Sequence, residues 1–153
     1  MTLIDCQNNQ LIINWQSKEH IYFADVPLLV NFVKMKTIRE IVFYKDYFND
    51  FFDTLTDNVK NKIDEVLFMM TILERVPTKF FKSIEGVKGL FEIRIEYESN
   101  IYRIFCCFDK GNLVILFNGF QKKTQRTPTK ELNKAEKIMK EYFKEQNENG
   151  NKK

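Results

Sequence analysis

Three successive segments of alternating side chains, all within residues 90–122, constrain the fold of this 153-residue chain more than any other feature. We predict strands at Leu90–Tyr97, Ile101–Asp109 and Asn112–Lys122, because apolar and polar residues alternate along them. The connections between these strands are short, and Gly111 in the second connection favours a tight hairpin. Neighbouring strands joined in this way run antiparallel. The segment therefore predicts an antiparallel sheet.

The alternation also assigns the side chains to two faces of the sheet. The odd-numbered residues of 91–97 and the even-numbered residues of 102–108 are the more apolar sets. Packing these two sets together places Arg94 and Arg103 side by side on the opposite face. We expect helices to cover the apolar face and leave the arginine face open.

The hairpin at Gly111 extends this assignment to the third strand. A two-residue loop at Lys110-Gly111 would place Arg103 across from Asn118 and send Leu113, Ile115 and Phe117 into the core. Asn118, Phe120 and Lys122 would then lie on the arginine face. That face also keeps an apolar patch, for which the terminal helix, residues 1–34 or a partner protein are candidate covers: Phe105, Cys107, Val114 and Leu116.

The rest of the chain predicts one strand and three helices. Residues 38–44 are β-rich, and apolar residues at helical spacing follow Asp46 and again follow Thr56 or Asp57, up to Pro77. Residues 78–89 read as a loop, and a last helix begins at Thr127, with Pro128 in its first turn. The expected fold class is α+β: a strand, a helical hairpin, an antiparallel three- to four-stranded sheet and a C-terminal helix.

The predicted domain covers residues 35–146. Residues 147–153 form a polar tail, and residues 1–34 form an N-terminal extension unless translation starts at Met35. No stretch is apolar enough for a membrane span, and the chain begins without a secretory signal. The three cysteines do not suggest disulfides, so a cytoplasmic location is expected.

Charged residues narrow the possible chemistry. His20 is the single histidine, so a histidine-based triad or zinc site is improbable, and we expect neither a metal nor a cofactor. The net charge is +3, with 19 lysines but 5 arginines. Two of those arginines are predicted at strand centres, and a guanidinium fork fits phosphate better than an ammonium does.

The arginine face therefore suggests an RNA site. Basic residues expected near it are Lys79, Lys82, Lys122, Lys123 and Arg126, and an aromatic ring such as Phe120 could stack on a base or fill the core. The alternative is that the arginines pair with Glu92 or Glu96 and the face is merely solvated.

The sequence from Gly86 to Pro128 resembles the RelE/ParE superfamily of toxin–antitoxin toxins, in particular its HigB-like, phage-derived branch. Three motifs carry the resemblance in the branch's order: GLFEIR from Gly89, YRIF from Tyr102, and GFQKKT from Gly119, with Thr127-Pro128 following. The loop RVPTKFFKSIEG from Arg75 also matches. The resemblance covers about residues 36–143.

This resemblance implies a small α+β toxin that cleaves mRNA on the ribosome and is silenced by a helix-turn-helix antitoxin. In a metal-independent reaction, the ribose 2′-hydroxyl attacks the adjacent phosphate. We assign Arg94 and Arg103 to phosphate stabilisation and Lys122 and Lys123 to backbone binding or proton transfer. Glu92 and Glu96 remain rival bases. Lys79, Lys82, Asn118, Phe120 and Arg126 are expected to bind RNA.

Two alternatives stay open at this point. A ParE-like toxin would act by binding DNA gyrase and would leave mRNA intact. An inactive relative would serve as a binding module. Neither alternative needs nuclease chemistry, so the two are separated from the first hypothesis by whether mRNA is cut.

Overall fold

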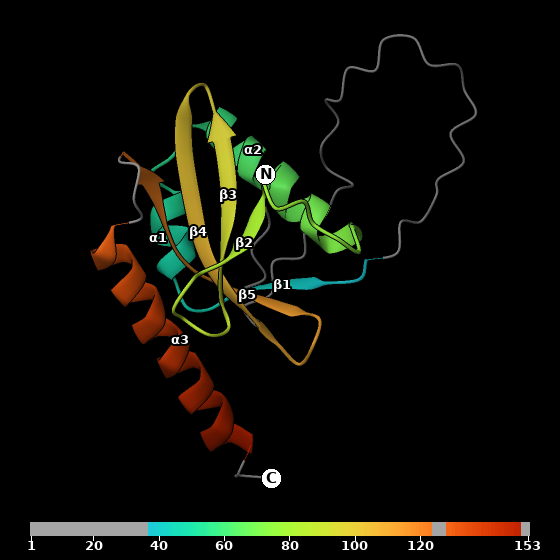
Figure 1. The fold of residues 1–153 in the computed structure, drawn as a ribbon, viewed down its shortest axis with the longest axis vertical. Helices are drawn as coiled ribbons and strands as arrows, with labels where there is room; N and C mark the ends of the chain where they lie inside the picture. The colour runs from blue at the N-terminus through green and yellow to red at the C-terminus, as the bar shows by residue number, and fades with distance from the viewer. Residues whose placement is uncertain (1–36, 124–127, 151–153) are drawn as a thin grey trace, which may run out of the picture.

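The computed structural model describes residues 37–123 and 128–150, and these form an α+β domain (Figure 1). This confirms the expected fold class. In chain order, the elements are β1 (Glu40–Phe43), α1 (Tyr47–Phe52), α2 (Asp57–Ile72), β2 (Phe81–Ser83), β3 (Leu90–Tyr97), β4 (Asn100–Asp109), β5 (Leu113–Lys122) and α3 (Thr129–Gly150).

The strands form a five-stranded sheet in the order β1-β5-β4-β3-β2. β1 runs parallel to β5, whereas the other neighbours are antiparallel. The predicted loop at 78–89 contains the edge strand β2, so the sheet has one strand more than expected. The ring of Phe81 in β2 stacks on Phe91 of β3 at a centroid distance of 5.0 Å, which gives this short strand an apolar anchor.

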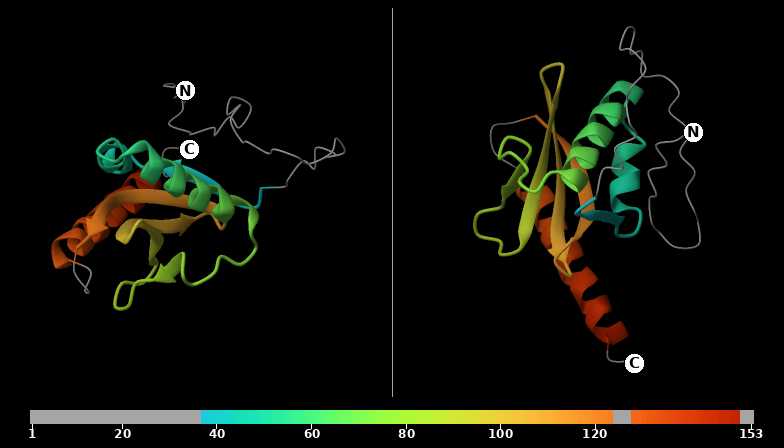
Figure 2. Two further views of the ribbon diagram at one scale, coloured as in Figure 1. Left: turned by 90° about the horizontal axis from the view of Figure 1, so that it is seen from above. Right: turned by 90° about the vertical axis from the view of Figure 1, so that its right-hand side faces the viewer.

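Helices cover both faces of the sheet (Figure 2). The first core, between the sheet and α1–α2, includes Phe48, Ile63 and Ile104. The second core, between the sheet and α3, includes Phe105, Phe117 and Ile138. The expectation of helices on one side was therefore wrong. The second face is too apolar to stay open, and among the described residues α3 is the helix that covers it.

The β4–β5 hairpin departs from the predicted register in two places. Its loop has three residues, since Asp109 pairs with Leu113, and this turns Val114 and Leu116 into the first core. A bulge farther along β5 then shifts the register again, so that Arg103 lies opposite Phe120 and not Asn118. Each shift is one residue, so together they restore the predicted alternation of side chains between the two faces of the sheet. Beyond the bulge, Phe120 therefore returns to the arginine face, as predicted.

The correction also moves three predicted core residues. Ile115 and Phe117 belong to the second core, under α3, instead of the first, and Leu113 packs against the second core as well. Their side chains alternate with those of Val114 and Leu116, which are buried under α1–α2. The middle of β5 is thus apolar on both faces, as expected for a strand with helices on either side.

Gly119 lets α1 approach β5 closely. A Cβ atom at this position would lie 2.1 Å from Cδ1 of Phe51, which is too close for any real side chain. The aromatic ring occupies the space that a larger residue on β5 would need. Glycine in the GFQKKT segment is therefore required by packing of the helical hairpin on the sheet.

Both ends of the hairpin helices are stabilised differently from what the sequence predicts. Asp46 and Thr56 occupy the N-cap positions, but neither side chain makes a capping hydrogen bond. At the other end of α2, the guanidinium of Arg39 donates to the carbonyl oxygens of Met70 at 3.0 Å, of Leu73, and of Glu74 at 2.6 Å. Arg39 thus satisfies carbonyls that have no intrahelical partner.

Side-chain contacts attach α3 to the sheet along its length. Near its start, Asn118 donates to the Glu131 carboxylate at 3.1 Å. In its second half, the Tyr142 hydroxyl donates to Asp109 at 2.8 Å, and Lys45 pairs with Glu141 and Glu145. The helix continues through residues 147–150 of the expected tail. The expected cap Thr127 lies outside the described residues.

No helix within residues 37–123 and 128–150 has the length and hydropathy needed to cross a membrane.

Candidate functional site

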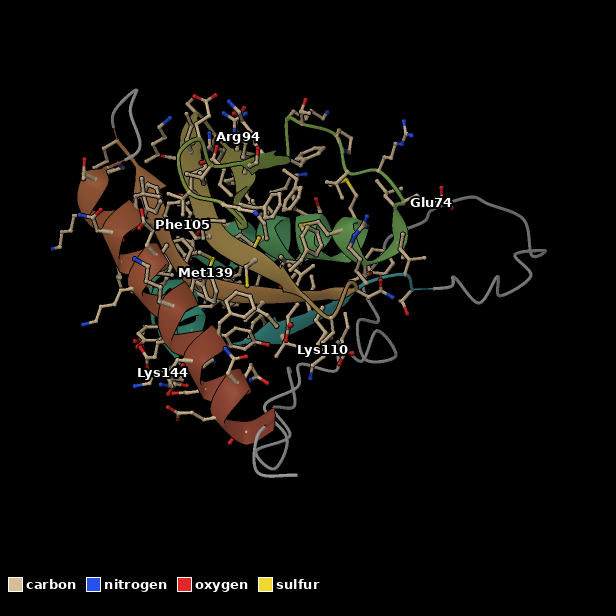
Figure 3. All side chains as sticks on the ribbon, turned by 60° about the horizontal axis from the view of Figure 1, so that its bottom comes forward. Glu74, Arg94, Phe105, Lys110, Met139 and Lys144 are labelled. Atoms are coloured by element: carbon tan, nitrogen blue, oxygen red, sulfur yellow. The ribbon has the colours of Figure 1, made fainter. Side chains whose placement is uncertain are left out.

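Arg94 and Arg103 face each other across the centre of the β3–β4 pair. This confirms the register predicted from alternation. Both side chains lie on the face that α3 partly covers, because Leu90 on the same side of β3 belongs to the second core. Figure 3 shows Arg94 farther from α3 than Phe105, which lies next to that helix.

A carboxylate lies between the two guanidinium groups. Glu92 Oε1 is 3.2 Å from Nε of Arg94, and Glu92 Oε2 is 3.5 Å from Nε of Arg103. The Glu92 side chain is 9% exposed. Two arginines directly opposite each other would repel, and a shared carboxylate reduces that repulsion. The structure thus forms the ion pairing that was the alternative to an open RNA site, at least for Glu92.

The two arginines differ in accessibility. The Arg103 side chain is 2% exposed and donates from Nη1 to the carbonyl of Tyr102 at 3.0 Å. Burial lowers the pKa of Arg103, the neighbouring positive charge of Arg94 lowers it further, and Glu92 and Glu96 oppose both effects. The Arg94 side chain is 30% exposed. Arg94 is therefore the more accessible of the two guanidinium groups.

Three cross-strand rows organise the charged residues on this face. In the first row, Lys82 of β2 pairs with Glu92 of β3. In the second row, Arg94 of β3 pairs with Arg103 of β4. In the third row, Glu96 of β3 pairs with Ile101 of β4, which pairs with Lys122 of β5. Acidic and basic residues therefore alternate along β3, with a lysine at the end of the first and third rows. Lys122 is partly buried and Lys123 is exposed at the end of β5.

Phe120 and Asn118 are less accessible than a binding role requires. The Phe120 ring is 8% exposed and stacks on Phe105 at a centroid distance of 5.6 Å. Asn118 is 1% exposed, and its amide donates to Glu131. Of the two roles open for Phe120, the structure favours core filling, and Asn118 anchors the start of α3.

The remaining predicted residues are not all gathered at this site. Lys79 is exposed, and its ammonium lies 4.6 Å from the ring centroid of Phe80, which packs on the first core. Arg126 lies outside the described residues. The predicted residues that share this face are thus Lys82, Arg94, Arg103 and Lys122, together with Glu92.

One contributor was absent from the predicted site. Glu131 of α3 accepts from Asn118, so it helps to set where α3 crosses the sheet. The sequence gives one signal for it, since an acidic residue in the first turn of a helix is electrostatically favourable there. That signal says nothing about a partner on β5, because the register of the bulged strand had to be known first.

Comparison with known families extends these observations. A family model described as Phage derived protein Gp49-like (DUF891) matches residues 50–140. The matched region runs from α1 into α3 and contains β3, β4 and β5, with all the residues of the arginine face described above. No curated protein matches the chain.

Proposed function

This chain belongs to the Gp49-like family of phage-derived proteins, which are toxins of the toxin–antitoxin type related to RelE and ParE, and we propose that it is a ribosome-dependent mRNA endoribonuclease of the HigB-like kind. Its partners in this proposal are a cognate antitoxin with a helix-turn-helix and the mRNA on the ribosome. It acts in the cytoplasm.

The observation that carries the proposal is the state of Arg94. Its Nε is held next to the buried Glu92 carboxylate, while the side chain remains 30% exposed. Within the described residues its guanidinium makes no hydrogen bond, and its Nε is buried without a hydrogen-bond partner. A guanidinium that lies beside a buried carboxylate, has unused donors and is still partly exposed can receive phosphate oxygens.

The reaction needs no group beyond those on this face. The 2′-oxygen of the ribose attacks phosphorus, its proton passes to a base, and the bond from phosphorus to the 5′-oxygen breaks. A proton donated to that 5′-oxygen completes the step and leaves a 2′,3′-cyclic phosphate and a 5′-hydroxyl. Arg94 stabilises the charge that develops on the phosphate oxygens.

Arg103 has a different place in this scheme from the one the sequence suggested. Because it is buried, it supports Arg94 through the shared Glu92 instead of touching the phosphate. Lys122 lies two positions beyond Phe120 on β5 and belongs to the same face, and Lys123 follows it. In the proposal, these lysines hold the RNA backbone and one of them transfers a proton. Lys82 binds RNA from the other side of Arg94.

The test is induced expression in a bacterial host, with growth recorded and the 5′ ends of mRNA mapped. The variants are Arg94→Gln and, as a matched control, Arg75→Gln, which changes an exposed arginine outside the face. We expect growth arrest with new cuts inside translated codons for the wild type and for the control. We expect Arg94→Gln to lower the cleavage rate about 10²- to 10³-fold.

Other outcomes contradict the nuclease proposal. Arrest with intact mRNA and damaged DNA would favour a gyrase-binding toxin. Wild-type protein that accumulates in folded form without arrest would favour an inactive binding module. Equal cleavage by the wild type and Arg94→Gln would remove Arg94 from the mechanism.

A further inference from the structure

The lysines of α3 all lie on the side of the helix that faces away from the sheet. At 100° per residue, they fall within an arc of about 120°. All are exposed, whereas Ala135, Ile138 and Tyr142 on the opposite side are buried. These lysines are Lys130, Lys134, Lys137, Lys140 and Lys144.

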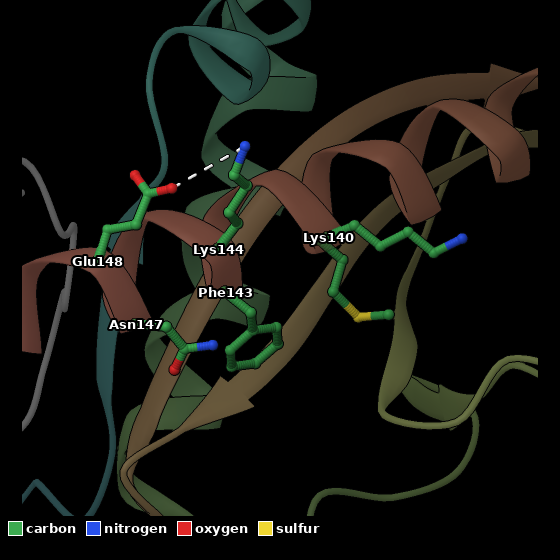
Figure 4. A pocket seen from close by; sticks show the side chains of 6 residues that line it. Lys140, Phe143, Lys144, Asn147 and Glu148 are labelled. Carbon is green, nitrogen blue, oxygen red and sulfur yellow. Dashed lines mark ion pairs between the residues drawn. The ribbon is translucent and has the colours of Figure 1, made fainter. Parts of the chain in front are cut away.

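The two halves of this row differ in their partners. In the second half, Lys140 lies 3.9 Å from Glu136, and Lys144 lies 3.9 Å from Glu148 (Figure 4). In the first half, no carboxylate of the described residues lies within ion-pair distance of Lys130 or Lys137. The row is thus neutralised toward its C-terminal end and unneutralised toward its N-terminal end.

The carboxylates near the start of α3 are directed elsewhere. The Glu131 carboxylate accepts a hydrogen bond from the buried Asn118, and the Glu136 carboxylate pairs with Lys140. Lys134 lies 5.9 Å from the ring centroid of Tyr47, a contact with a π system instead of an anion. The positive charge in this half of the helix is therefore left facing solvent.

The end of β5 adds two more cations. The hydrogen bond from Asn118 to Glu131 ties β5 to the first turn of α3, so the last residues of β5 lie near the start of the helix. Lys122 and Lys123 occupy that end, and no carboxylate in the described part of the chain lies within ion-pair distance of either. We call this group the α3–β5 basic surface, and it comprises Lys122, Lys123, Lys130, Lys134 and Lys137.

Helix electrostatics alone do not favour this arrangement. The N-terminal end of a helix carries partial positive charge and prefers acidic side chains, and the C-terminal end prefers basic ones. α3 has both Glu131 and Lys130 in its first turn and Glu148 in its last, with no basic residue in that last turn. The helix dipole thus favours Glu131 but not Lys130 or Glu148, and an anionic partner would account for the lysines near the start of the helix.

We propose that the α3–β5 basic surface binds the phosphate backbone of double-helical RNA. This inference rests on the proposed function, because a nuclease that works on the ribosome contacts structured RNA around the cut strand. Lysine acts as a point charge and reads no sequence, which suits backbone contacts. The ring beside the surface, Tyr47, is partly buried and already lies against Lys134, so a duplex backbone fits the surface better than the unpaired bases of a single strand.

The test measures binding of a labelled RNA duplex of about 16 base pairs. Fluorescence anisotropy is recorded between about 50 and 200 mM salt. The test variant is Lys130→Gln/Lys137→Gln, and the matched control is Lys140→Gln/Lys144→Gln. Both double variants remove two exposed lysines from the same helix, so they differ in which half of the row is changed.

We expect the test variant to bind more weakly and to flatten the plot of log affinity against log salt by about two units, since each phosphate contact contributes nearly one. The control should bind within about 2-fold of the wild type, because its lysines already have carboxylate partners. Thermal melting of both variants should match that of the wild type, which separates binding from folding.

Equal losses of duplex affinity in the two double variants would overturn the inference, since the position of the lysines along α3 would then not matter. Unchanged duplex binding in the test variant would overturn it as well, as would tighter binding of a single strand of the same length. Arg94→Gln serves as a separate measurement. If it abolishes cleavage while duplex binding is insensitive to Lys130 and Lys137, the proposed function stands and this inference fails. If duplex binding depends on these lysines but mRNA is never cut, the reverse holds.

Discussion

Arg94 and Arg103 occupy directly paired positions on β3 and β4, and the carboxylate of Glu92 lies between their Nε atoms. One arginine is almost completely buried and the other is partly open to solvent. The buried charge pair is therefore structural, while the outer guanidinium is available for an anion. This division predicts that stability and activity respond to different members of the group.

Glu92→Gln should cost about 3–5 kcal/mol of unfolding free energy, because it leaves the buried charge of Arg103 without its carboxylate. Urea unfolding monitored by circular dichroism measures this. Glu96→Gln, on the same face of β3 but exposed, should change stability by less than about 0.5 kcal/mol. Similar losses in the two variants would mean that Glu92 and Arg103 are not an effective pair.

A double variant sharpens the same point. Adding Arg103→Met to Glu92→Gln removes the charge that the first substitution leaves unpaired. The double variant should therefore be less destabilised than the sum of the two single variants, with an interaction energy of about 1–3 kcal/mol. Additive losses would show that the stabilising effect of Glu92 does not depend on Arg103.

Gly119→Ala should destabilise the domain by about 1–3 kcal/mol, because the added methyl group overlaps the Phe51 ring. Gly150→Ala is the control, since a Cβ there meets nothing within 4 Å. Combining Gly119→Ala with Phe51→Ala should relieve the overlap, so that the two changes are not additive in thermal melts. A neutral Gly119→Ala would show that α1 shifts away from β5 at little cost.

Arg39→Ala should lower the unfolding free energy by about 1–3 kcal/mol through the loss of charged hydrogen bonds to carbonyls in the last turn of α2 and just beyond it. Hydrogen exchange of the last turn of α2 should speed up more than that of its first turns. Arg75→Ala, an exposed arginine a few residues beyond α2, should leave both measurements unchanged.

The raised pKa of Tyr142 predicts that the folded protein loses stability at alkaline pH. Burial, and then the hydrogen bond to Asp109, raise the pKa of its phenol in the folded protein. The unfolded chain releases this proton near pH 10, so above that pH the unfolded state binds fewer protons and stability falls. The contribution is fully present below about pH 10 and declines by up to about 1.4 kcal/mol per pH unit above it.

Tyr142→Phe checks this dependence. The variant should lose about 1 kcal/mol at neutral pH, where the hydrogen bond to Asp109 is missing. Its stability should then fall less steeply between pH 10 and 11, as read from urea midpoints. A slope equal to that of the wild type would show that another group is responsible for the alkaline loss.

Much of the fold follows from local pattern. The alternation in β3 and the first half of β4 gave the pairing of Arg94 with Arg103, and the helical spacing of Val59, Ile63 and Met70 gave the buried face of α2. These features depend on neighbours in the sequence, where the period of the side chains reports directly on which face is buried.

The errors arose where tertiary packing decides. The extra residue in the Gly111 loop and the bulge beyond Phe117 leave no mark in the alternation of β5, which is apolar on both faces. The sequence also did not show that Arg103 would be buried while Arg94 stays partly open. That difference depends on how far α3 and Phe120 extend over the sheet, which is a property of the assembled layers.

The parallel pair of β1 and β5 has a consequence for synthesis of the protein. β1 is the first described strand to be made, but its partner is the last, with α1, α2 and three strands between them in the chain. A nascent chain can therefore form the helical hairpin early and must wait for β5 before the sheet closes. Since Lys122 is the last residue of β5 and the covering helix α3 follows it in the chain, the arginine face is incomplete until α3 has been made.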